Sequence, residues 1–247
     1  MNIGRIFGVE VKLHWSSFLM LAMFAFFGFF GSQLTSLVVG IALFLIILMH
    51  EFGHILTARF FGYPISGITL HMLGGVAVTR EKADERWWQK FFVILNGPLT
   101  NLILGIILSF CISPTTWEIF LLIQQTPEPE IISSFGFMTF CLCYIYLVNW
   151  VILVFNLIPV FPLDGGQLFQ SGVWGFLRLF GVKNNTARNM SLVACCSIGM
   201  VLAAACAVFF FINLNILIGL MFILGILICY VTAEDSLRKL KGLPAKY

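Results

Sequence analysis

Long apolar segments restrict the fold of this chain more than any other feature of its sequence. A helix that crosses the hydrocarbon core of a bilayer needs about 20 predominantly apolar residues, and six segments of the chain meet that requirement. Hydrophobic residues make up 60% of the 247 residues and charged residues only 10%, whereas a soluble domain carries about 25% charged residues. The sequence therefore predicts one α-helical polytopic membrane domain over residues 1–247, with about six transmembrane helices. The predicted spans are 13–31, 36–61, 91–111, 135–160, 187–211 and 214–232.

Three segments outside these spans have a pattern of their own. Residues Val9 to Leu13 alternate between apolar and charged residues, which is typical of a short strand. Ile65 to Thr79 is rich in β-branched residues and contains Gly74-Gly75, so it predicts a hairpin or strand pair. Gly166 to Phe180 is apolar with one arginine and predicts a short interfacial or re-entrant helix. We therefore expect a small membrane-associated β element beside the helices.

The basic residues orient the predicted bundle. Lysine and arginine are absent from the connections 32–35, 112–134 and 212–213. They occur before the first span, after the last span, and in the alternate connections or at the ends of the spans that border them, so the positive-inside rule predicts cytoplasmic N- and C-termini. A bacterial or archaeal plasma membrane is the expected location. The net charge of +3 is small and scattered, which argues against a nucleic-acid partner.

The chain carries His50-Glu51-Phe52-Gly53-His54 directly after a stretch without charges, Leu37 to Met49. Ionisable side chains inside a membrane are costly unless they pair with one another or bind something. On a helix, His50 and His54 lie one turn apart on the same face, within reach of one metal ion. A catalytic zinc ion takes three protein ligands and leaves one position for water. The pattern therefore predicts a zinc hydrolase buried in a bilayer, with one Zn²⁺ per chain.

Two carboxylates are candidates for the rest of this chemistry. Glu51 is either a direct ligand or a general base, and its neighbouring position on the helix turns it away from the common face of the histidines, which favours a base that takes a proton from zinc-bound water. Asp84 lies in a polar run and Asp235 in the C-terminal tail. Asp164 alone follows an apolar span within a Pro/Gly-rich break, so it is the preferred third ligand.

These residues resemble the site-2 proteases, a family of intramembrane zinc metalloproteases. The landmarks that carry the resemblance, in family order, are Val11-Lys12-Leu13-His14-Trp15-Ser16, His50-Glu51-Phe52-Gly53-His54, Gly74-Gly75, Asn96-Gly97-Pro98-Leu99-Thr100-Asn101, Asn156-Leu157-Ile158-Pro159, Leu163-Asp164-Gly165-Gly166 and Asn213-Leu214. The resemblance implies that Asp164 is the third zinc ligand and that Asn156 lies near the active centre. It also implies cleavage of membrane-anchored substrate proteins in or near their transmembrane segments, as in regulated intramembrane proteolysis. We expect a compact form without an accessory soluble domain.

The handling of a substrate leaves several alternatives open. A transmembrane helix must unwind before hydrolysis, and its freed backbone groups need partners, which an added strand at residues 65–79 would supply. That segment is alternatively only a structural hairpin. Asn156 either binds the substrate or the oxyanion, or bridges helices, and Asn101 and Asn149 are interpreted as helix-bridging residues. The alternative functions are a non-catalytic metal-binding transporter, a di-iron oxidase and a protease-like binder. The transporter is disfavoured because the polar cluster is confined to two spans, and the oxidase because the chain has four histidines.

Overall fold

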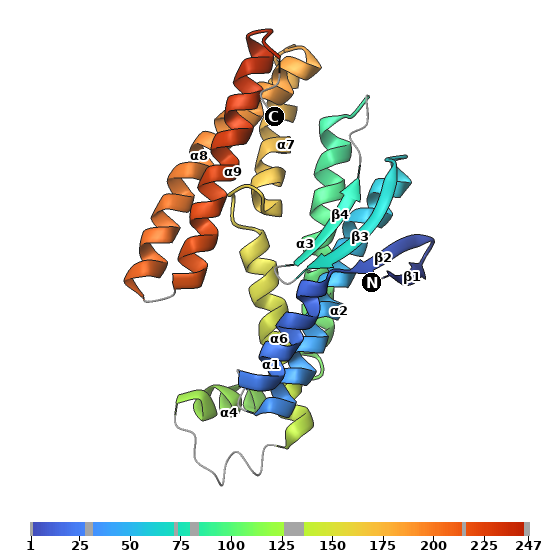
Figure 1. Cartoon of the computed structure of the whole chain (residues 1–247), viewed down its shortest axis with the longest axis vertical. Helices are drawn as coiled ribbons and strands as arrows, with labels where there is room; N and C mark the ends of the chain where they lie inside the picture. The colour runs from blue at the N-terminus through green and yellow to red at the C-terminus, as the bar shows by residue number, and fades with distance from the viewer. Residues whose placement is uncertain are drawn as a thin grey trace. The chain divides into compact units, whose positions relative to one another are not determined.

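The computed structural model describes residues 2–27, 32–71, 74–79, 84–125, 136–213 and 216–244. The chain divides into two compact units, the first comprising Met1–Glu81 and Asn96–Leu153, the second Lys82–Leu95 and Val154–Tyr247. Figure 1 shows the elements in chain order: β1 (Asn2–Ile6), β2 (Val9–Leu13), α1 (Trp15–Phe27), α2 (Gln33–Phe60), β3 (Ile65–His71), β4 (Gly74–Thr79), α3 (Trp87–Ser109), α4 (Pro114–Gln125), α6 (Phe137–Asn156), α7 (Asp164–Leu179), α8 (Asn184–Ile212) and α9 (Ile216–Leu240).

Five of the described helices are long and apolar enough to cross a membrane: α2, α3, α6, α8 and α9. They correspond to five of the six predicted spans, and their ends differ from the predicted ones by one to four residues, except that α9 ends at Leu240, eight residues beyond the predicted end. The sixth predicted span, residues 13–31, contains α1, which has 13 described residues. Residues 28–31 of that span lie outside the described part of the chain. The prediction of a helical membrane fold with a small β element is confirmed.

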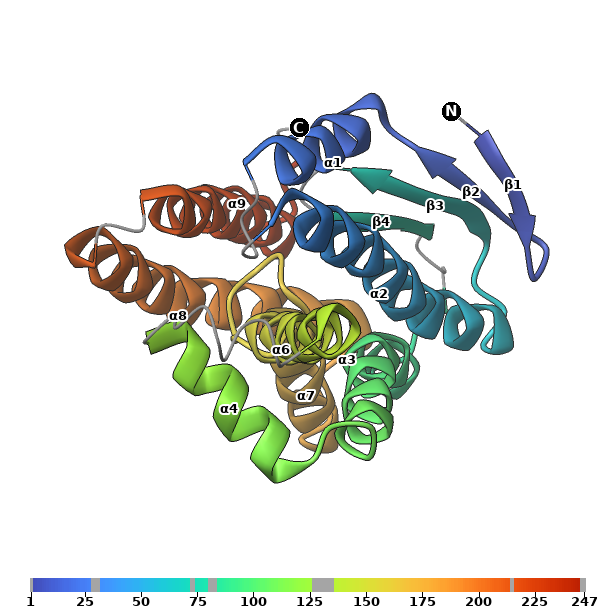
Figure 2. The ribbon, with the colours of Figure 1, turned by 90° about the horizontal axis from the view of Figure 1, so that it is seen from below.

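In the first unit, four strands form one sheet in the order β1-β2-β3-β4. The outer pairs are antiparallel, whereas β2 and β3 run parallel, with Val11 opposite Ile68. The sheet lies along α2, as Figure 2 shows. Val11 and Ile68 are buried in one apolar cluster with Phe52 and Ile55 of α2. The strand predicted at Val9 to Leu13 and the strand pair predicted at Ile65 to Thr79 are both confirmed.

Helix α4 of the first unit was not expected from the sequence. Its Phe120 is fully buried in a cluster with Ile112 and Tyr144. The Phe120 and Tyr144 rings meet edge to face with centroids 4.9 Å apart. The helix is too short to span a bilayer, and its position against α6 is explained by this aromatic packing.

The second unit is built around the helical hairpin of α8 and α9, which run side by side. Small residues such as Ala203 and Ala207 of α8 let the two helices approach, and Phe222 of α9 fills the space between them with Val160. Helix α7 packs on α8, where Gln170 donates a hydrogen bond to Ser191 Oγ at 2.8 Å. The helix predicted from Gly166 to Phe180 is thereby confirmed as α7.

Candidate metal centre

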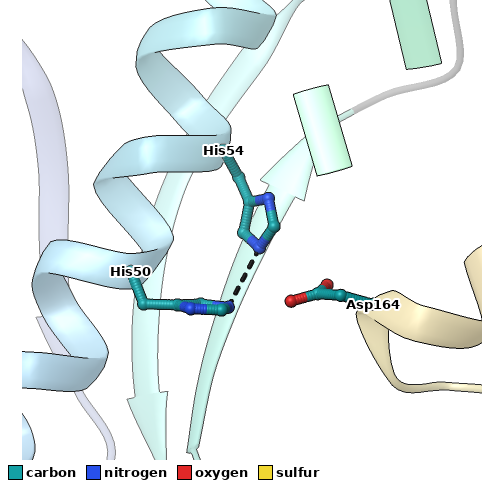
Figure 3. Close-up of side chains that lie close together, drawn as sticks. All are labelled: His50, His54 and Asp164. Carbon is teal, nitrogen blue, oxygen red and sulfur yellow. Dashed lines mark hydrogen bonds between the residues drawn. The ribbon is translucent and has the colours of Figure 1, made fainter. Parts of the chain in front are cut away.

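The two histidines of the His-Glu-x-x-His motif converge on α2. Because an α-helix has 3.6 residues per turn, His50 and His54 lie on one face. Their Nε2 atoms are 3.1 Å apart, and the rings stand nearly perpendicular with centroids 4.8 Å apart. Figure 3 shows both imidazoles pointing toward one another from the helix. Two nitrogens bound to one tetrahedral Zn²⁺ at about 2.05 Å are separated by about 3.3 Å, so the observed spacing is close to that of a zinc pair.

Glu51 follows His50 on the same buried stretch of α2. It is rotated about 100° around the helix from His50, so its side chain leaves the helix on a different line from the two imidazoles. The residue is buried, although a carboxylate in an apolar span is costly to bury. This position agrees with a general base beside the histidine pair rather than with a third metal ligand.

Glycines bring α3 against the histidine face of α2. A methyl group on Gly97 would overlap the His54 imidazole and lie 2.9 Å from His50 Nε2. On the opposite helix, a methyl group on Gly53 would overlap the Asn96 carbonyl group and lie 2.5 Å from Thr100 Oγ1. Small residues at such crossings let membrane helices approach closely. The glycines of both motifs are therefore required by the contact of α2 with α3.

Two asparagines connect His50 to the helices around it. His50 Nδ1 is hydrogen-bonded to Asn101 Oδ1 of α3. Asn101 Nδ2 donates to Asn149 Oδ1 of α6 at 3.0 Å, and Asn149 Nδ2 donates to the Asn101 carbonyl oxygen at 3.0 Å. The predicted bridging of helices by these asparagines is present, but the contact with the metal-binding motif was not foreseen. A polar residue on a span needs a partner, and that requirement was the only signal in the sequence.

Asp164 belongs to the second unit, where it is the buried first residue of α7. A methyl group on Gly165 would overlap the backbone of Leu157 and Ile158, and one on Gly166 would lie 2.7 Å from the Phe161 nitrogen. The Asp-Gly-Gly sequence therefore lets the first turn of α7 pack directly on the turn that follows α6. A helix N-terminus also favours a negatively charged side chain. Figure 3 draws Asp164 on this turn.

Asn156 is the last residue of α6 and is half-buried. It belongs to the second unit, and so does Asp164, whereas His50, Glu51 and His54 belong to the first. Within the first unit the structure brings the two histidines together. The roles of Asp164 and Asn156 in the site are proposals.

The donor atoms of the motif suit a zinc ion. Zinc binds imidazole nitrogen and carboxylate oxygen, and it needs neutral histidines with a ring nitrogen directed at the ion. The convergent Nε2 atoms of His50 and His54 meet the second requirement, and the hydrogen bond at His50 Nδ1 is the support that metal-bound imidazoles usually have. The residues present therefore fit the ion.

Five helices of membrane-spanning length define a polytopic membrane protein, and buried His50 with half-buried His54 on one of them defines a candidate metal centre. The family model of Peptidase family M50 matches residues 38–202, a stretch that contains both histidines. The chain therefore belongs to Peptidase family M50.

Individual relatives agree with this family. A putative zinc metalloprotease of Synechocystis is 30% identical over 186 residues, 70% of this chain and 44% of that protein. A zinc metalloprotease of Methanocaldococcus jannaschii is 28% identical over 196 residues, 78% of this chain and 52% of that protein. The chain thus spans about half the length of the curated relatives it matches.

One solved structure has a similar fold. The site-2 protease from Methanocaldococcus jannaschii is matched over 100% of this chain and 98% of its own, with a TM-score of 0.56 and 23% sequence identity. The chain therefore has the fold of a site-2 protease and is a membrane-embedded protein.

Proposed function

We propose that this chain is an intramembrane zinc metalloprotease that hydrolyses peptide bonds in or near the transmembrane segments of membrane-anchored proteins. The observation that carries the proposal is the pair of imidazoles on an apolar helix, with Nε2 atoms 3.1 Å apart, in a member of Peptidase family M50. An imidazole pair inside a membrane needs a function, because burying such groups is costly.

His50, His54 and Asp164 would hold the ion, one per chain. When bound, zinc polarises the scissile carbonyl and lowers the pKa of water, so that a hydroxide nucleophile is available near neutral pH. Support for Asp164 comes from its chemistry and from its fixed backbone, since Gly165 and Gly166 seat the first turn of α7 on the preceding turn. Two imidazoles and one carboxylate are a ligand set that catalytic zinc uses.

Glu51 and Asn156 would act on the substrate. Glu51 accepts a proton from the attacking water and delivers it to the nitrogen of the leaving amine. Its burial beside the histidine pair supports this role, because a base in a site with little water transfers its proton to the substrate rather than to solvent. The Asn156 side-chain amide donates a hydrogen bond to the oxyanion or to the substrate backbone.

The metal content of the purified protein tests the proposal. We expect one zinc ion per chain, cleavage of a single-span model substrate in detergent or vesicles, and loss of both in Asp164→Asn. Loss of a residue that only supports a ligand lowers metal affinity by up to about 100-fold. Loss of a ligand itself should therefore lower zinc affinity by at least about 100-fold. Zinc bound without cleavage would instead favour the metal-binding transporter. A wild-type protein without metal contradicts both functions.

Substrate binding would use the free edge of β4. An unwound substrate needs partners for its backbone N–H and C=O groups, and an edge strand offers them by strand addition. Among the described strands, β4 pairs only with β3 and is one edge of the sheet, the other edge being β1. The segment at 65–79 therefore supplies the candidate docking strand for substrate.

Proline substitutions separate this role from a structural hairpin. Successive residues of a strand direct their N–H groups to opposite sides, and proline removes the N–H group of its position. Among Val76→Pro, Ala77→Pro and Val78→Pro, a proline at a position whose N–H points away from β3 removes a hydrogen bond to substrate and keeps the pairing with β3. We expect at least one of these variants to lose about tenfold or more in cleavage, the effect of about 1.4 kcal/mol of transition-state binding, with zinc content unchanged. Arg5→Pro, on the β1 edge, is the matched control and should cleave normally. Normal cleavage by all four variants rejects β4 as the docking strand.

The charge distribution supports an orientation with both termini in the cytoplasm. The proposed location is the cell membrane of a bacterium or archaeon. Arg238 and Lys239 lie in the last turn of α9 and Lys241 follows it, whereas no basic residue lies between α8 and α9. His50 and His54 then lie nearer the cytoplasmic end of α2, and water would reach them from that side.

A further inference from the structure

A chain of hydrogen bonds runs from α6 through α3 to the first histidine of the motif. It joins Asn149 to the Asn101 carbonyl oxygen, Asn149 Oδ1 to Asn101 Nδ2, and Asn101 Oδ1 to His50 Nδ1. The direction of every bond in this chain can be determined from one end, because a backbone carbonyl oxygen only accepts.

The fixed end orients the two amides. The Asn149 atom that contacts the Asn101 carbonyl oxygen must be the amide nitrogen, which donates at 3.0 Å. Its carbonyl oxygen then faces Asn101, so the Asn101 atom at 3.0 Å from it must be the amide nitrogen. The remaining Asn101 atom, Oδ1, therefore faces His50, and an amide oxygen only accepts.

The histidine tautomer follows from this direction. His50 Nδ1 must carry the proton that it donates to Asn101 Oδ1. In a neutral imidazole the other nitrogen then holds the lone pair. That nitrogen is Nε2, the atom 3.1 Å from His54 Nε2, so the lone pair lies on the atom that the proposed metal centre requires.

We propose that Asn101 and Asn149 are positioning residues for the metal centre: they fix the tautomer and the ring orientation of His50, so that its Nε2 is presented to a divalent metal ion. The inference rests on the proposed function, since it concerns the same centre. It assigns to two span residues a role beyond the bridging of helices.

Burial makes the arrangement effective. His50 is 4% exposed, Asn101 1% and Asn149 0%, so bulk water does not replace a lost bond in this chain. A buried donor or acceptor without its partner costs the full desolvation of that group. Supporting bonds of this kind orient metal-bound histidines, and their removal lowers metal affinity by about 10- to 100-fold.

A purely structural bridge between α3 and α6 is the competing explanation, and a double variant distinguishes the two. Asn101→Leu removes the acceptor of His50 and also leaves Asn149 Oδ1 without its donor, whereas Asn149 Nδ2 keeps the backbone carbonyl oxygen of residue 101. Asn101→Leu with Asn149→Leu removes that unpaired amide oxygen as well, and replacing both partners of a hydrogen bond by apolar groups of similar shape is close to neutral for stability. Stability and metal affinity should therefore respond differently to the second substitution.

The experiment measures zinc affinity by competition with a chromophoric chelator, together with Tm, for the full-length protein in detergent. We expect zinc affinity about 10- to 100-fold below wild type in both Asn101→Leu and the double variant. The Tm of the double variant should recover toward that of wild type. Thr100→Val is the matched control: it removes a hydroxyl of the same helix turn that donates only along the helix, to the Asn96 carbonyl oxygen at 2.8 Å, and it should bind zinc as wild type does.

Each outcome decides the matter. Recovery of zinc affinity in the double variant, or an equal loss in Thr100→Val, overturns the positioning role in favour of a structural one. Wild-type affinity in Asn101→Leu overturns it directly, and if that single variant does not fold, the double variant still gives the answer. A wild-type protein that binds no zinc rejects the proposed metal centre itself, whereas zinc-binding wild type with unaffected variants rejects only this inference.

Discussion

Glu51→Gln should abolish most peptide hydrolysis while leaving zinc bound. The substitution keeps the size of the side chain and its position on α2 and removes the group that accepts a proton. General acid–base catalysis contributes about 10²- to 10⁴-fold to a rate, so kcat for a single-span model substrate should fall by that factor. Zinc content and affinity should remain those of wild type, because His50 and His54 are unchanged. The measurement pairs a cleavage assay with metal analysis of the same preparation.

Glu118→Gln is the matched control for this change, since Glu118 is an exposed residue of α4. It makes the same chemical change away from the candidate centre and should leave both cleavage and zinc content as they are. A Glu51→Gln protein that cleaves at the wild-type rate contradicts the role of general base. A protein that loses its zinc would make Glu51 a ligand instead.

Much of this fold could be predicted from the sequence because the membrane restricts the structures that an apolar segment can adopt. A span of about 20 apolar residues must form a helix in lipid, where every backbone polar group needs an internal partner. Five predicted spans are helices for that reason. The alternation in Val9 to Leu13 and the β-branched residues of Ile65 to Thr79 were sufficient to predict β2, β3 and β4.

The elements that escaped prediction depend on contacts between distant parts of the chain. Strand β1 exists through its pairing with β2, and its short sequence contains Gly4, which weakens any local preference for a strand. Helix α4 has 12 residues, fewer than a span needs, so the length requirement of a span did not predict it. Buried Phe120 explains its position against α6. The parallel pairing of β2 with β3 joins segments more than 50 residues apart, and neither segment carries a local sign of it.

The candidate centre shows the same division in its detail. The spacing of His50 and His54 predicts their convergence, because four residues make about one turn. The facing helix carries a matching pair with the same spacing: Gly97 meets His54, and Asn101 meets His50. Each pair is visible in the sequence. Packing decides which face of α3 turns toward α2, so the contact of Gly97 and Asn101 with the two histidines could not be predicted from the sequence.

Gly97→Ala should remove most of the zinc affinity with a single methyl group. The added carbon would overlap the His54 imidazole and approach His50 Nε2 to 2.9 Å, so either the rings rotate or α3 withdraws from α2. Rotation of the rings changes the 3.1 Å spacing of the two Nε2 atoms, which is within a few tenths of an ångström of the zinc requirement. Withdrawal of α3 breaks the hydrogen bond between Asn101 and His50 Nδ1, which orients the ring. Zinc affinity should fall by at least about 100-fold, more than for loss of a supporting residue, and cleavage should fall with it.

Gly172→Ala is the control that isolates the position of the methyl group. Gly172 lies within α7, and an added carbon there would have no neighbour within 4 Å. Alanine is the better helix former by about 1 kcal/mol, so this variant should bind zinc normally and be as stable as wild type or more so. The affinities of both variants, measured against the same chelator, test the contact between α3 and the histidines. Wild-type affinity in Gly97→Ala would mean that the helices yield without moving the imidazoles, and the close approach of α3 would then have no part in shaping the centre.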